Sequence, residues 1–166
     1  MKPRLAWLAP TALLVSLGAC GLQPLYSGGG NGALAQGLSA IQIAPIQGRA
    51  GWLVRNALTD RLTQRGSAAA TARYRLDVVL DDKVEGLGLL TDETTGRERR
   101  TLRARYQLVD LADGKILVDA TAGSDAGIDV VSSEYATIAA ENTALENLAG
   151  AVADRIVARL ALTLRP

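Results

Sequence analysis

The chain contains 166 residues with a mass of 17.4 kDa, the size of one domain. Hydrophobic residues make up 48% of it, enough for a core, and 18 Lys and Arg residues nearly balance 17 Asp and Glu residues. The net charge of +1 creates no field that would attract nucleic acid. The absence of His and the presence of one Cys exclude a histidine base, an internal disulfide and a cysteine-cluster zinc site. We therefore predict a protein that is not an enzyme and binds neither metal nor nucleic acid.

The first residues have the pattern of a bacterial export signal. Lys2 and Arg4 precede an uncharged apolar run over residues 5–17, which is shorter than the ~20 residues that a transmembrane helix requires. The run ends in Leu17-Gly18-Ala19-Cys20, which resembles a lipobox, the site where lipoprotein signal peptidase cuts before a lipid-modified Cys. Residues 1–19 are thus predicted to be a lipoprotein signal peptide, with covalent lipid on Cys20. The alternatives are a plain signal peptide with an unrelated Cys, or a structural thiol inside a helix.

Residues 20–37 are predicted to form the lipidated N-terminus and a flexible tether, because a Gly-rich run occupies most of this stretch. Gly21 bears on the location, since an Asp at this position favours the inner membrane in lipoprotein families. By resemblance, Gly21 implies an anchor in the outer membrane, on its periplasmic side. Several acyl chains on Cys20 would make that attachment stable.

A folded domain is predicted over residues 38–166, starting with a strand over 38–45. A helix follows over 48–65, because Val54, Leu58 and Leu62 recur every four residues. Gly66 fits the left-handed conformation that ends many helices.

Three further strands are predicted from alternation of apolar and polar residues. They cover residues 73–84, 97–111 and 116–122, and Asp113-Gly114 indicates a tight hairpin between the last two. One face of these strands is expected to point into the core, namely Tyr74, Leu76, Val78, Leu80, Leu102, Ala104, Tyr106, Leu108, Ile116, Val118 and Ala120.

A long C-terminal helix completes the predicted fold. Ser132 or Ser133 is placed to cap it, with Glu134 in its first turn. Its expected apolar stripe consists of Ile138, Leu145, Leu148, Val152, Ile156 and Leu160. The order β-α-β-β-β-α predicts an α+β two-layer sandwich, in which both helices pack on one face of a four-stranded mixed sheet and the other face is polar.

The first residues after the lipobox carry a family resemblance. Residues 20–26 read Cys-Gly-Leu-Gln-Pro-Leu-Tyr, which resembles the start of the LPS-assembly lipoprotein family LptE, especially its alphaproteobacterial members. The element order and the long last helix are similar to that family across nearly the whole mature chain. The resemblance implies a protein that plugs the lumen of the LPS-translocating LptD barrel, helps that barrel to assemble, and contacts lipopolysaccharide.

The densest group of cations in the chain offers a candidate binding site. It consists of Arg97, Arg99, Arg100, Arg103 and Arg105. Arginine matches phosphate oxygens bidentately, so lipopolysaccharide headgroup contact is one interpretation. The other is neutralisation by Glu93, Glu98 and cross-strand acids, with Asp77 near Arg105. Lys115, in the hairpin turn, is either a further contact to anionic lipid or a solvated side chain.

Two aromatic residues, Tyr26 and Trp52, suit an interfacial anchor, although core packing is the commoner role and is expected for Trp52. Asp81 and Asp82 cannot form a catalytic dyad, because adjacent strand residues point to opposite faces. Two other functions stay open from the sequence. One is a periplasmic auxiliary lipoprotein of an ABC-type lipid or solute transporter, and the other is a hydrolase that works through carboxylates alone.

Overall fold

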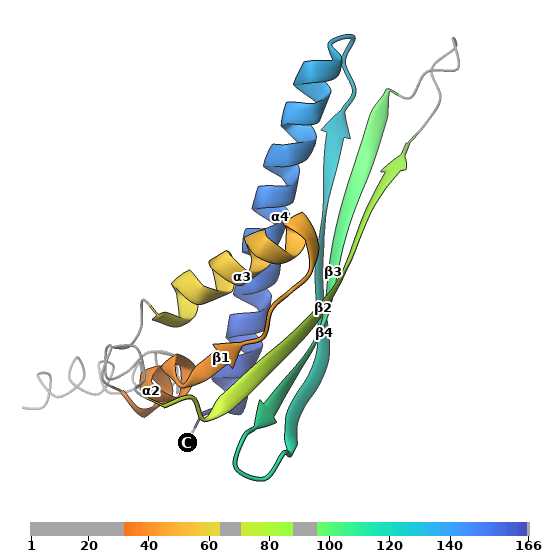
Figure 1. Cartoon of the computed structure of the whole chain (residues 1–166). Helices are drawn as coiled ribbons and strands as arrows, with labels where there is room; N and C mark the ends of the chain where they lie inside the picture. Colours follow the sequence, from red (N-terminus) through yellow and green to blue (C-terminus); the bar gives the residue numbers. More distant parts are fainter. Residues whose placement is uncertain (1–31, 64–70, 88–95, 166) are drawn as a thin grey trace, which may run out of the picture.

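A long twisted sheet forms one layer of the molecule, and helices cover one of its faces (Figure 1). The computed structural model describes residues 32–63, 71–87 and 96–165. The elements in chain order are α2 (Ala33–Ser39), β1 (Ile41–Ile43), α3 (Gly48–Thr63), β2 (Tyr74–Gly86), β3 (Arg97–Asp110), β4 (Ile116–Asp129) and α4 (Glu134–Thr163). The spatial strand order is β1-β2-β3-β4, with β1 parallel to β2 and the other pairs antiparallel. The predicted α+β class and mixed four-stranded sheet are confirmed, and α2 is an addition.

The core lies between the sheet and the helices α3 and α4. The inner face of the sheet carries the alternating residues that the sequence predicts, and Leu76, Leu102 and Leu108 have no exposed surface. Of the predicted stripe on α4, every member from Leu145 onward is buried, whereas Ile138 is 47% exposed. The first turns of α4 thus extend beyond the apolar core, which explains why the pattern failed there. Among the described residues, no helix is both long and apolar enough to cross a membrane.

The start of the folded domain differs from the prediction. Residues 33–37 were expected in the tether and 38–45 in a strand, but Ala33–Ser39 is helical and the strand is only Ile41–Ile43. Leu34, Ala35 and Leu38 share one helical face, and Leu38 is fully buried in the core. Tertiary burial of this face outweighs the weak helix propensity of the Gly-containing sequence. The predicted tether before residue 32 lies outside the described residues, as do Cys20 and Tyr26.

Strand β4 is longer than predicted and begins differently. It continues past residue 122 to Asp129 and pairs with β3 back to Arg97. The glycines of this stretch lower strand propensity, but pairing along β3 overrides it. At the other end a register shift between Leu108 and Val109 places Ile116 opposite Val109 and leaves it 50% exposed, not inward as predicted.

Local signals at two element ends are confirmed. Gly114 adopts φ +73° in the hairpin turn, where its N–H donates to the carbonyl oxygen of Asp110 at 2.9 Å. At the start of α4, Ser133 is the cap, and its hydroxyl accepts from the N–H of Ala136 at 3.4 Å. The described part of α3 ends at Thr63, so Gly66 lies outside the described residues.

Candidate functional site

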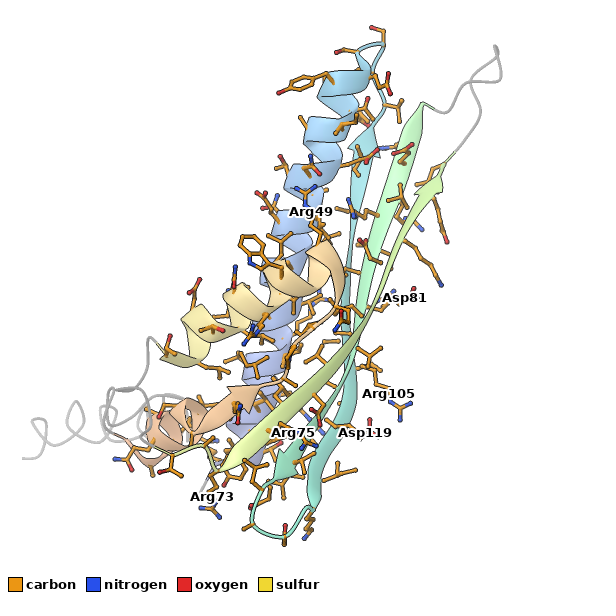
Figure 2. The ribbon with its side chains drawn as sticks, viewed as in Figure 1. Arg49, Arg73, Arg75, Asp81, Arg105 and Asp119 are labelled. Carbon is orange, nitrogen blue, oxygen red and sulfur yellow. The ribbon has the colours of Figure 1, made fainter. Side chains whose placement is uncertain are left out.

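The outer face of the sheet, opposite α3 and α4, carries a column of arginines along the central strand. Strand alternation places Arg97, Arg99, Arg103 and Arg105 on this face of β3. Acidic residues flank the column on both neighbouring strands, with Asp77, Asp81 and Glu85 on β2 and Asp119, Asp125 and Asp129 on β4. At ~3.3 Å per residue, the 14 residues of β3 make this face about 45 Å long. Figure 2 shows Asp81, Arg105 and Asp119 pointing away from the helices.

Two of the outer arginines form ion pairs with β4. Arg97 Nε lies 3.2 Å from Asp129, and an Arg105 nitrogen lies 3.1 Å from Asp119. The Asp119 carboxylate also accepts a 2.9 Å hydrogen bond from the Gln107 amide. The hydrogen bonds from Arg105 and then Gln107 lower the pKa of the Asp119 carboxyl, and the same bond with Asp119 raises the pKa of Arg105.

The acid expected beside Arg105 has a different partner. The register places Asp77 opposite Gln107 and places Arg105 opposite Val79, and Asp77 forms its ion pair with Arg75 at 3.0 Å. Asp77 and Arg105 still line the same shallow hollow on the outer face. The ion pairs of the column are therefore made with β4, a strand whose length the sequence pattern underestimates.

The two remaining outer arginines, Arg99 and Arg103, form no ion pair or side-chain hydrogen bond with any described residue. Their neighbours on β4 are Gly127 and Gly123, respectively. The Arg103 side chain lies so close over Gly123 that a Cβ at this position would clash with it. Arg99 and Arg103 are four residues apart in the sequence, and so are Gly123 and Gly127. This matched spacing is the signal that could have indicated that the arginines lie opposite the glycines. On β2 the register places Glu85 opposite Arg99 and Asp81 opposite Arg103, so an acidic residue lies beside each guanidinium group without forming an ion pair with it.

Arg100 lies on the opposite face from the other arginines, toward α4. Its side chain is 13% exposed and binds Asp82 bidentately at 2.6 and 2.9 Å. It also donates to the backbone carbonyl of Glu141 on α4 at 3.1 Å. The hydrogen bond with Asp82 raises the pKa of Arg100 despite partial burial. Arg100 thus connects the sheet to α4, and strand alternation separates it from Arg99.

The remaining predicted contact, Lys115, lies in the β3–β4 hairpin at the other end of the sheet. At ~3.3 Å per residue, the 11 residues from Arg99 to Asp110 separate the two regions by about 35 Å. The five predicted contacts therefore do not form one site. Arg97, Arg99 and Arg103 share the outer face, Arg100 lies on the inner face, and Lys115 lies at the hairpin.

Other residues singled out in the sequence have clear positions. Asp81 pairs with Lys83 at 3.0 Å on the outer face, whereas Asp82 pairs with Arg100 on the inner face, as alternation predicts for a non-catalytic pair.

Trp52 is 61% exposed on α3, so the prediction of core packing is wrong for it. Glu98 lies on the inner face, and one of its carboxylate oxygens is buried without a hydrogen-bond partner among the described residues. Glu93 lies outside the described residues.

Solved structures with the same fold come from several bacterial lipoproteins. A candidate lipoprotein from Caulobacter crescentus is 25% identical, with a TM-score of 0.66 over 81% of this chain and 99% of that chain. A minor lipoprotein from Acinetobacter baumannii is 15% identical, with a TM-score of 0.60 over 75% of this chain and 92% of that one. The rare lipoprotein B from Shewanella oneidensis is 14% identical, with a TM-score of 0.52 over 74% of this chain and 94% of that one. No curated protein sequence matches the chain.

A sequence-family model is more specific than these structural likenesses. The model for LptE, described as lipopolysaccharide assembly, matches residues 38–160. This range contains the whole sheet, all of α3 and nearly all of α4. The chain therefore belongs to the LptE family of non-enzymatic lipopolysaccharide-assembly lipoproteins.

Proposed function

We propose that this protein is an outer-membrane lipoprotein that plugs and helps to assemble an LptD-type barrel during insertion of lipopolysaccharide. In this proposal residues 1–19 are removed, lipid on Cys20 anchors the chain on the periplasmic side, and the segment before α2 is the tether. The family match supports a partnership with LptD. The higher identity to the Caulobacter structure than to the other two supports the alphaproteobacterial type.

The observation that carries the plug proposal is the outer face of the sheet. It is about 45 Å long, none of the described helices covers it, and charged or polar side chains occupy most of its positions (Figure 2). The lumen of an outer-membrane barrel is polar, so a polar surface of this length suits the barrel wall.

Within this face, Arg99 and Arg103 are the proposed contacts to lipopolysaccharide phosphates, with Arg97 beside them. Arg99 and Arg103 form no ion pair with a described residue, although Glu85 and Asp81 lie opposite them on β2, and Arg97 has only an exposed partner in Asp129. An exposed ion pair is weak enough to be exchanged for a phosphate. Arg100 supports the surface from behind, because its guanidinium is bound to Asp82 and to α4.

The partnership is tested by affinity purification of the tagged, membrane-expressed protein in mild detergent, with mass spectrometry of its partners and its N-terminus. The proposal predicts a large outer-membrane barrel in stoichiometric amount and an acylated N-terminal Cys20. A Cys20→Ala variant is the control for anchoring. Recovery of permease or substrate-binding components in place of a barrel would contradict the proposal and favour an auxiliary lipoprotein of a transporter.

A further inference from the structure

The sheet has open edges that differ in how strongly they resist an added strand. Strand β1 covers β2 only from Tyr74 to Leu76, so β2 is open beyond that point. Charged residues lie along that open stretch of β2 and along β4, whose outer edge is also free. They are Asp77, Asp81, Asp82, Lys83 and Glu85 on β2, and Asp119, Asp125 and Asp129 on β4. Such charges discourage pairing with another strand. The free edge of β1 reads Ile-Gln-Ile and has no charged residue.

The backbone of β1 presents unpaired groups at this edge. The Ala40 carbonyl accepts from the N–H of Tyr74 at 3.1 Å, and the N–H of Ala44 donates to the Leu76 carbonyl at 3.0 Å. Because pairing groups alternate along a parallel ladder, Ala40, Gln42 and Ala44 face β2. The N–H and C=O groups of Ile41 and Ile43 therefore point away from β2, and no described residue bonds to them.

Helix α3 forms the second wall of a groove along this edge. The groove has a volume of about 200 Å³ and is lined by Ser39, Gln42 and Ile43 on one side and Arg55, Thr59 and Thr63 on the other. Arg55 is exposed and forms no ion pair with any described residue. A strand edge beside a helix is an arrangement that binds extended peptides, with backbone hydrogen bonds for affinity and side-chain contacts for specificity.

We propose that this groove binds a short extended segment of another polypeptide, which pairs with β1 and places a carboxylate against Arg55. Charge complementarity to Arg55 favours an acidic occupant, and the two undescribed segments next to α2 and α3 in the sequence carry no acidic side chain. Residues 1–31 and 64–70 contain no Asp or Glu. Asp92 and Glu93 lie in the connection that follows Gly86 at the far end of β2. At ~3.3 Å per residue, the 12 residues from Tyr74 to Gly86 place that end of β2 about 40 Å from β1. An acidic segment of a different chain is therefore the occupant that fits the charge of this groove.

The test uses the full-length lipoprotein in detergent and two sets of fluorescein-labelled seven-residue peptides. The peptides of both sets have Thr and Val in varied order around a central residue. That central residue is Glu in one set and Lys in the other. We expect the best Glu peptide to bind at least about tenfold more tightly than its Lys counterpart, measured by fluorescence anisotropy. Arg55→Glu should reverse this preference. Arg155→Glu, the same charge change at an exposed position on α4, should leave it unchanged.

Backbone pairing is tested separately. N-methylation of alternate nitrogens on the pairing edge of the best Glu peptide should abolish its binding, and the bound peptide should slow hydrogen exchange of the Ile41 and Ile43 amides. Three results would overturn the proposal: no binding by any Glu peptide at millimolar concentration, equal affinity for Glu and Lys peptides, or Ile41 and Ile43 amides already protected in the free protein. The last result would show that the chain covers its own edge.

Discussion

The two faces of the same sheet use charged residues in different ways. On the inner face, Arg100 is nearly enclosed and has Asp82 and the Glu141 carbonyl as fixed partners. On the outer face one residue earlier, Arg99 is exposed and has no ion-pair partner among the described residues. The ion pair on the inner face therefore connects the two layers, whereas the outer face combines exposed ion pairs with the unpaired side chains of Arg99 and Arg103.

The largest contrast between the faces should appear in packing. Val78 and Val79 are neighbours on β2, but Val78 is 8% exposed and Val79 is 72% exposed. We expect Val78→Ala to lower the free energy of unfolding by about 2 kcal/mol, because it removes buried methyl groups and leaves a cavity. Val79→Ala is the matched control and should change it by less than about 0.5 kcal/mol in urea denaturation. Equal losses in the two variants would show that both faces are buried.

A second prediction concerns the polar link from the sheet to α4. Arg100→Leu should lower the free energy of unfolding by about 1.5 kcal/mol, because it leaves the partly buried carboxylate of Asp82 without its partner. The double variant Arg100→Leu with Asp82→Leu should recover part of that loss, since no unpaired charge is left. Additive losses in the double variant would mean that the two residues act independently.

The third prediction tests the outer arginines. Arg99→Asp combined with Arg103→Asp should weaken lipopolysaccharide binding by the soluble domain about tenfold, or about 1.4 kcal/mol, through loss of two guanidinium–phosphate contacts. Arg155→Asp with Arg159→Asp on α4 is the control for net charge, and binding should stay within about twofold of the wild type. An equal loss in both double variants would indicate general electrostatic attraction and not a site.

The smallest predicted effect is on a titration. Hydrogen bonds from Arg105 and Gln107 hold the pKa of the Asp119 carboxyl below its ordinary value, so the stabilisation they supply is present above the ordinary carboxyl pKa. It is lost as the pH falls through the folded-state pKa. Arg105→Gln should raise the pKa of Asp119 in a carbon-13 NMR titration, and Arg155→Gln should not. An unchanged Asp119 titration in Arg105→Gln would show that the pair does not form in solution.

The sequence was sufficient for the sheet, both long helices and the inward alternation of β2 and β3, because periodic burial dominates there. Alternation also predicts that Arg99 and Arg100 point to opposite faces of the sheet. The sequence therefore contained the information needed to separate Arg100 from the other arginines, and grouping them in one site was wrong. The shift at Val109 that turns Ile116 outward was not readable, because a bulge depends on the pairing of two strands. The burial of α2 and the continuation of β4 past Gly123 likewise depend on tertiary contacts that local propensity does not contain.

The most direct test of the plug proposal is site-specific photo-crosslinking in cells. A photoreactive residue is placed at Val79, an exposed position on the outer face, and for comparison at Glu146, an exposed position on α4. The account predicts that Val79 gives adducts to a large outer-membrane barrel in clearly higher yield than Glu146. Barrel adducts from Glu146 with none from Val79 would contradict it, because the outer face of the sheet would then not be the surface that meets the barrel wall.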